Sequence, residues 1–110
     1  MRNTILLSCL LAIAVVPHAA AQQTAATVAD IRYSGGDGLT IKKAIAITGA
    51  KTTGEGVAAE QEWIRANLPG ASIESQGRVT GPPHYDVITV RLVTGERRDI
   101  HFDITAFYGK

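Results

Sequence analysis

The chain has 110 residues, of which 45% are hydrophobic, and its 11 basic and 10 acidic side chains leave a net charge of +1. A length of this size corresponds to a single domain. The balanced charge gives no basic surface of the kind that attracts nucleic acid, so we expect no nucleic-acid partner. Cys9 is the only cysteine, which excludes a disulfide within the chain.

The first 21 residues have the layout of a secretory signal peptide. Arg2 precedes an apolar run at 5–16, and three alanines end the segment at 19–21. The run is well short of the roughly 20 residues that span a membrane. We therefore expect cleavage between Ala21 and Gln22, export to the periplasm or the medium, and no membrane anchor afterwards. Cleavage would also remove Arg2 and Cys9.

The order of the elements after this segment indicates one α+β domain at 30–110, preceded by a flexible lead-in at 22–29. The glycine-rich sequence at 34–38 is typical of a turn. A short apolar run at 43–48 predicts a strand. Thr52 and Glu55 then have the spacing of a capping box, which predicts a helix over 53–67 that ends before Pro69.

The predicted helix has one apolar stripe, formed by Val57, Ile64 and Leu68, with Trp63 at its edge. Glu60 lies between Trp63 and this stripe. A carboxyl group beside apolar surface can have a raised pKa and act as a general acid. The alternative interpretation is that Glu60 bonds backbone groups or an arginine in a purely structural role.

Three strands are predicted between residues 71 and 107. In the segment ASIESQGRVT, at 71–80, the alternation places Ile73, Ser75, Gly77 and Val79 on one face. The segments 85–93 and 96–104 each carry three apolar residues on one face. We expect an α+β fold in which an N-terminal strand and one amphipathic helix accompany a three-stranded antiparallel meander packed on the helix, with a cystatin-like outline.

Two His-x-Asp triplets raise the question of a metal site, and the register of the last two strands decides it. A two-residue loop at 94–95 would place His84, Asp86, His101 and Asp103 on one face, where they could bind a metal ion. A three-residue loop at 94–96 would instead place Ile88 opposite Phe102 and join all the apolar residues into one face. Because burial of apolar residues specifies the face of a strand strongly, we expect the second register.

Several segments together resemble a group of small exported bacterial proteins of unknown function. The segments are YSGGDG, AIAITGA, AEQEW, YDVITV and the final FDITAFYGK, and they extend over almost all of 30–110. The resemblance implies a bacterial origin and one compact domain. It implies no activity, substrate or catalytic residue.

The sequence favours a non-catalytic binding or inhibitor-like module whose partner is a protein or a small ligand, without a cofactor. Aromatic side chains expected on short loops are candidate binding residues, since aromatics are favoured anchors in interfaces: Tyr33, Tyr85, Phe107 and Tyr108. For Phe107 we expect packing in the core rather than binding. One alternative is a small hydrolase or metal-binding protein that uses Glu60 or the four His and Asp residues. A further alternative is an accessory protein of the cell envelope.

Overall fold

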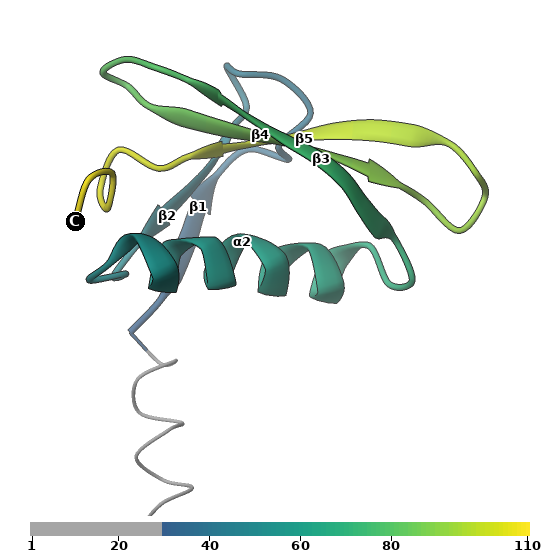
Figure 1. Ribbon diagram of the computed structural model, residues 1–110, viewed down its shortest axis with the longest axis horizontal. Helices are drawn as coiled ribbons and strands as arrows, with labels where there is room; N and C mark the ends of the chain where they lie inside the picture. Colours follow the sequence, from purple (N-terminus) through teal and green to yellow (C-terminus); the bar gives the residue numbers. More distant parts are fainter. Residues whose placement is uncertain (1–29) are drawn as a thin grey trace, which may run out of the picture.

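The computed structural model describes residues 30–110, so the expected signal peptide and lead-in lie outside the described residues. The described chain has the α+β class, with a helix below a strongly twisted five-stranded sheet (Figure 1). In chain order the elements are β1 (Arg32–Gly35), β2 (Ile45–Thr48), α2 (Thr53–Asn67), β3 (Ser72–Val79), β4 (Tyr85–Arg91) and β5 (Arg97–Asp103). Within residues 30–110 there is no helix long and apolar enough to cross a membrane.

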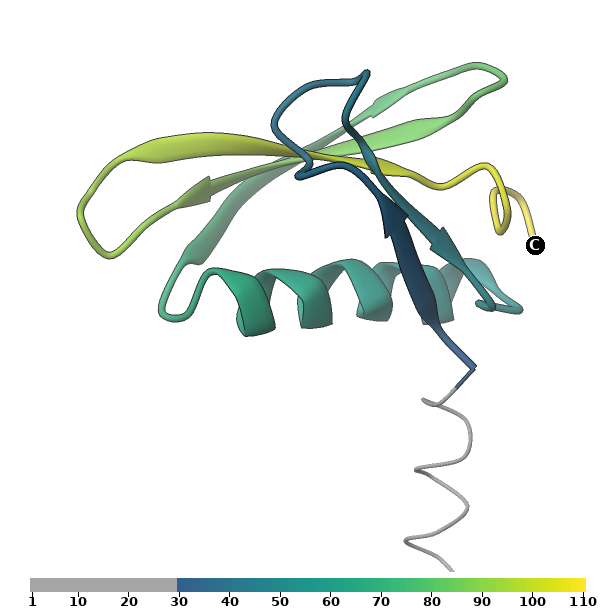
Figure 2. The same cartoon turned by 180° about the vertical axis from the view of Figure 1, so that it is seen from behind.

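The sheet is mixed and larger than the sequence predicted. Its strand order is β1-β2-β5-β4-β3, so the expected antiparallel meander of β3, β4 and β5 continues into two further strands. β2 pairs with β5 in parallel, and β1 pairs with β2 antiparallel. The expectation of a single N-terminal strand was wrong because Arg32–Gly35, next to the glycine-rich turn, forms a strand before the turn begins. In the view from behind, β1 and β2 lie in front of α2, and β3 rises behind them from the C-terminal end of the helix (Figure 2).

The register of β4 and β5 differs from the predicted one by two residues. Ile88 lies opposite Ile100, not opposite Phe102. The loop is Val93-Thr94-Gly95, where Gly95 has φ +92° and its N–H donates to the Leu92 carbonyl. A shift of two residues leaves every side chain on its face, so the apolar pattern predicts the face correctly but cannot fix the register. A glycine with positive φ at the end of a three-residue loop does fix it.

β3 contains an irregularity that changes its faces. Ile73 is opposite Val90 and Ser75 is opposite Thr89, so Glu74 has no partner of its own in β4. This bulge places Ile73 on the same face as Gln76 and Arg78, which lie opposite Ile88 and Asp86. The predicted grouping of Ile73 with Ser75, Gly77 and Val79 was therefore wrong, because one extra residue in a strand reverses the alternation after it.

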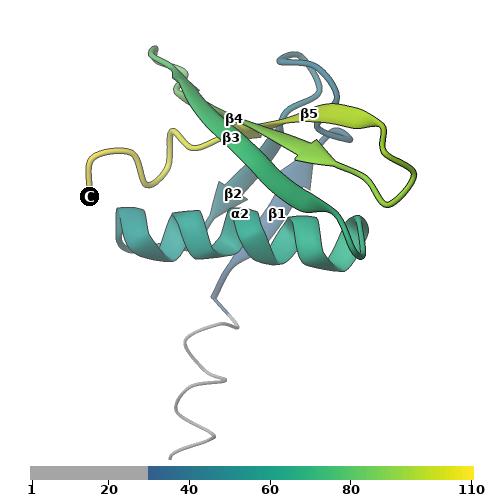
Figure 3. The same ribbon diagram turned by 45° about the vertical axis from the view of Figure 1, so that its right-hand side comes forward.

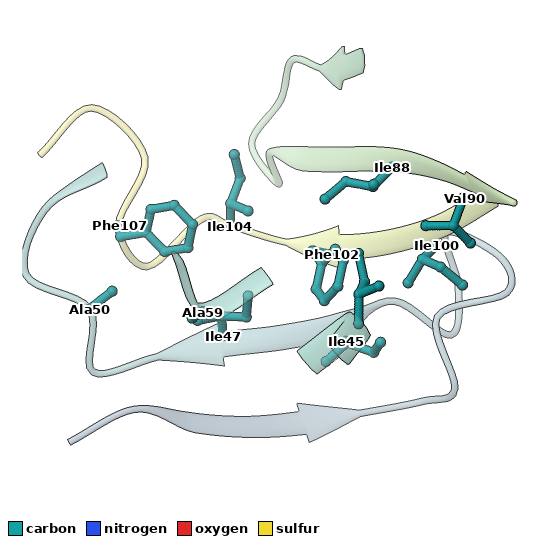
Figure 4. Packing of buried hydrophobic residues seen from close by; sticks show 11 residues of the cluster. Ile45, Ile47, Ala50, Ala59, Ile88, Val90, Ile100, Phe102, Ile104 and Phe107 are labelled. Carbon is teal, nitrogen blue, oxygen red and sulfur yellow. The ribbon is translucent and has the colours of Figure 1, made fainter. Parts of the chain in front are cut away.

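The core lies between the concave face of the sheet and α2. Its buried apolar side chains come from β2, β4, β5, α2 and the segment after β5 (Figure 4): Ile45, Ile47, Ala50, Ala59, Ile64, Ile88, Val90, Ile100, Phe102, Ile104 and Phe107. Trp63 is partly buried and meets the Phe102 ring edge-on, with 5.7 Å between the ring centroids. One continuous core of this kind is what a single small domain requires.

The bounds of α2 confirm the predicted helix at 53–67. The N-cap Thr52 accepts a hydrogen bond from the Glu55 N–H at 3.1 Å, and the Glu55 carboxylate accepts one from the Lys51 N–H at 2.9 Å. These bonds satisfy N–H groups that a helix start leaves free. The helix ends at Leu68, before Pro69.

Loss of the Thr52 cap has a measurable expected effect. Thr52→Ala should lower the free energy of unfolding by about 1 kcal/mol, because the Glu55 N–H loses its acceptor. Urea unfolding followed by circular dichroism measures this change. Thr94→Ala, in the exposed β4–β5 loop, is the control and should change stability by less than about 0.5 kcal/mol. Equal effects of the two substitutions would contradict the capping role.

Candidate functional site

Two carboxyl groups meet in the interface between α2 and the sheet. Asp86 lies two residues before Ile88, so strand alternation turns it to the face of β4 that meets the helix. Glu60 lies one turn before Ile64 on the buried side of α2. Both residues are 0% exposed. They are the only buried acidic residues within the described part of the chain, and we call them the carboxyl pair.

The hydrogen-bond donors around the carboxyl pair all serve Asp86. Arg78 Nε donates to Asp86 Oδ1 at 2.9 Å, and Gln76 Nε2 donates to Asp86 Oδ2 at 3.3 Å. Among residues 30–110, neither Glu60 oxygen has a hydrogen-bond partner, whereas each Asp86 oxygen has one. Asp86 is therefore placed to carry a negative charge, and Glu60 is not, since an ionised carboxylate without donors is very costly to bury.

The environment of Glu60 keeps it protonated at neutral pH. Burial and the neighbouring Asp86 carboxylate raise the pKa of Glu60 to about 9, against a smaller opposing effect of Arg78. A protonated Glu60 has one O–H donor, for which the Asp86 carboxylate is a nearby acceptor. The pair then holds one proton and one negative charge, and the Arg78 guanidinium balances that charge.

The burial of the carboxyl pair bears on its chemistry. A general acid must lie within hydrogen-bond reach of the group to which it gives its proton. Glu60 is enclosed by α2 and the sheet, so in this conformation it reaches Asp86 and not the solvent. The arrangement can hold a proton and join the helix to the sheet.

The segment after β5 adds an aromatic cluster next to Arg78. The Tyr108 ring stacks on the His84 ring, with 3.7 Å between centroids and 7° between planes, and the Arg78 guanidinium lies 5.4 Å from the centroid of the Tyr108 ring. Phe107, one residue earlier, is 1% exposed and packs against Gly56 of α2. The structure thus places Phe107 in the core, as expected, and Tyr108 at the surface, where it is 36% exposed.

The four residues of the possible metal site are not brought together. Asp86 faces α2, whereas His101 lies opposite Val87 and Asp103 opposite Tyr85, on the other face. The His101 ring donates from Nδ1 to the Gly38 carbonyl at 2.9 Å. Asp103 accepts two hydrogen bonds from Thr105. Within residues 30–110, no three His, Cys, Asp or Glu side chains are close enough to hold a metal ion.

The remaining aromatic candidates lie apart from one another. The Tyr33 hydroxyl donates to the Ala59 carbonyl of α2 at 2.8 Å, which joins β1 to the helix. Tyr85 is half-buried on the outer face of β4, opposite Val79 and Asp103. The four aromatic residues therefore do not form one shared surface patch.

The edge of the sheet formed by β3 is open to solvent. All eight residues of β3 are exposed, and only β4 pairs with the strand. The start of β3 comes down beside the C-terminal end of α2 (Figure 3). A shallow hollow of about 270 Å³ lies there. Its lining comes from α2, the connection to β3 and β3 itself: Gln61, Ile64, Arg65, Leu68, Gly70, Ala71 and Ile73. We call this hollow and the adjoining edge of β3 the β3 groove.

Comparison with known proteins finds no matching family model, no similar curated protein and no similar solved structure. Sequence reasoning singled out Glu60 and Asp86 separately but missed that they meet. The sequence does indicate that both residues face the core, because Glu60 lies beside the apolar stripe of the helix and Asp86 shares its face of the strand with Ile88. Arg78 and Gln76 could not be found, since the bulge at Glu74 decides which face they occupy.

Proposed function

We propose that this protein is a non-catalytic binding module that takes up an extended polypeptide segment of another protein as an additional strand along β3. One observation carries the proposal: an edge strand of eight exposed residues lies beside a hollow whose lining combines apolar and polar side chains. Strand addition uses such an edge, with backbone hydrogen bonds giving affinity and pockets for alternate side chains giving specificity. The expected signal peptide would place this binding in the periplasm or outside the cell.

The two edges of the sheet are not equivalent as binding sites. β1 has four residues, and the side chain of its Tyr33 is already engaged by the Ala59 carbonyl of α2. β3 is twice as long, and Ile73 on its concave face is 45% exposed. An exposed, long edge strand readily pairs with another chain unless charges or bulges protect it. The bulge protects only the start of β3, which leaves 75–79 regular.

The groove defines the chemistry of the segment that would fit. Alternate side chains of an added strand point to the concave face. One of them would lie beside Ile73, Ile64 and Leu68, where an apolar residue buries the most surface. Polar residues two positions before and after it would share this face and lie near Gln61 and Arg65 at the rim. We therefore expect a short extended segment with an apolar residue at its centre.

A substitution at Ile73 tests the proposal. Peptides are first selected on residues 22–110 from a random displayed library, and their affinities are then measured by fluorescence anisotropy with synthetic peptides. Ile73→Glu should weaken binding by about tenfold or more, because it replaces an apolar side chain that lines the hollow by a charged one and costs about 1.4 kcal/mol or more of binding free energy.

Ile41→Glu is the matched control for this test. Ile41 is 43% exposed, close to the value for Ile73, and it belongs to the connection between β1 and β2 at the other end of the sheet. Its replacement should leave peptide affinity within about twofold. Failure of the library to yield any specific peptide, or equal losses for both variants, would count against binding at β3.

A further inference from the structure

The carboxyl pair is the polar connection between α2 and the β3–β4 half of the sheet. Glu60 comes from α2, Asp86 from β4, and the two donors to Asp86 come from β3. We propose that Glu60 and Asp86 share a single proton that joins the helix to this half of the sheet, and that loss of the proton opens the β3 groove and releases a bound segment. This regulation rests on the proposed function, whereas the titration of the pair does not.

The number of charges in the interface supports one shared proton. Two carboxyl groups that influence each other are fully buried, and one guanidinium, that of Arg78, pairs with Asp86. One proton leaves a single negative charge that Arg78 balances. Without the proton, two carboxylates lie together in a place from which water is excluded, and one of them has no donor at all. Such a pair repels strongly, so the interface must separate or take in water.

Other charged or titratable groups around Glu60 do not replace the proton. On β3 and β4 these are Arg78 and Asp86. Tyr108, from the segment after β5, stacks on His84 from the connection between β3 and β4. From β1, Tyr33 reaches the Ala59 carbonyl. On α2 itself, Glu62 and Arg65 are exposed and pair with each other. The side chains that β2 and β5 direct into this core are apolar.

The direction of the pH effect follows from the raised pKa of Glu60. The folded protein holds this proton to about pH 9, whereas the unfolded chain releases it near 4.5. The stabilisation from the protonated group is therefore complete below pH 4.5 and is lost as the pH rises through about 9. Alkaline conditions should weaken the attachment of α2, and neutral conditions should maintain it.

The carboxyl pair is adjacent to the β3 groove along the helix. Gln61 follows Glu60 directly, and Ile64 lies one turn further on; both line the hollow. On the other side, Arg78 and Ile73 belong to the same strand and the same face. A displacement of α2 from β3 that relieves repulsion at the pair must therefore also change the width of the hollow.

The first experiment measures the titration and its structural effect without any ligand. Residues 22–110, labelled with ¹³C and ¹⁵N, are titrated from pH 4 to pH 10.5 while the Glu60 Cδ shift is followed by NMR. We expect a midpoint near 9. Amide protection factors, corrected for intrinsic exchange, should fall by about tenfold or more in α2 between pH 7 and pH 10. A Glu60 midpoint near 4.5, or unchanged protection, would overturn the shared proton.

Two variants separate the carboxyl pair from other alkaline effects. Glu60→Gln keeps an N–H donor toward Asp86 but cannot ionise, so protection in α2 should no longer depend on pH. Glu62→Gln, which removes an exposed carboxylate two residues away, should behave like the unmodified protein. A pH dependence that persists in Glu60→Gln would overturn the proposal. The unmodified protein's own titration remains decisive even if Glu60→Gln folds poorly.

The second experiment tests whether the proton controls the groove. A peptide selected as described above should bind at least about tenfold more weakly at pH 10 than at pH 7, and Glu60→Gln should remove this difference. A Glu60 midpoint near 9 with equal affinity at both pH values would overturn the opening of the groove and leave the shared proton intact. The absence of any binding peptide at pH 7 would instead contradict the proposed function, whatever the titration shows.

Discussion

Replacing Phe107 by alanine is expected to lower the free energy of unfolding by about 3–5 kcal/mol, as is usual for a fully buried phenylalanine. The ring is 1% exposed and lies in the core with Ile104 and Ala59 (Figure 4). Its removal leaves a cavity between the N-terminal half of α2 and the segment after β5. Urea unfolding followed by the fluorescence of Trp63, the single tryptophan, measures the loss.

Tyr108→Ala is the control for this prediction because it removes a neighbouring aromatic ring at the surface. Tyr108 is 36% exposed and stacks on His84. A stacked pair of this kind contributes about 0.5–1.5 kcal/mol, so the loss should be much smaller than for Phe107. Similar losses for the two variants would contradict the assignment of Phe107 to the core and would return it to the candidate binding residues.

Alanine substitutions at two glycines of α2 should change the stability of the protein in opposite directions. A Cβ atom on Gly56 would lie 2.2 Å from the Phe107 ring, whereas a Cβ on Gly54 would have only the Thr52 hydroxyl near it, at 3.9 Å. Gly56→Ala should therefore destabilise the protein by about 1–3 kcal/mol through overpacking. Gly54→Ala should stabilise it by about 0.5–1 kcal/mol, since alanine favours the helix. Thermal and urea unfolding of the two variants measure both changes.

A double variant identifies the cause of the Gly56 effect. If the clash with Phe107 is responsible, Gly56→Ala should cost little or nothing when Phe107 is already alanine. The coupling between the two substitutions should then amount to about 1–3 kcal/mol. Additive losses in the double variant would show that the cost of Gly56→Ala arises elsewhere.

The local elements could be predicted well from the sequence because their signals are local. Thr52, Glu55 and Pro69 define where α2 begins and ends, and both bounds of the predicted helix are confirmed. Alternation of apolar residues predicted the faces of β4 and β5. The same alternation repeats every two residues, so it could not distinguish a register with Ile88 opposite Phe102 from the observed one with Ile100.

The candidate site depends on features that a sequence pattern does not contain. The meeting of Glu60 with Asp86 requires the position of α2 across the sheet, which no local signal specifies. The presence of Arg78 beside them depends on the bulge in β3, and one extra residue there decides whether the guanidinium faces the core or the solvent. The predicted meander has two outer strands, β3 and β5, and only the pairing of β2 with β5 leaves β3 as the open edge on that side of the sheet.

The strand order has a consequence for how the protein is made. β5 is the last strand in the chain, yet it lies at the centre of the sheet between β2 and β4, and its pairing with β2 joins residues 57 positions apart, Ile45 with Phe102. Contacts so distant along the chain form late in folding. A polypeptide still being synthesised cannot complete this core before β5 is available. Because β5 ends at Asp103, the apolar faces of β2, β4 and α2 stay without their central strand until almost the whole chain has been synthesised.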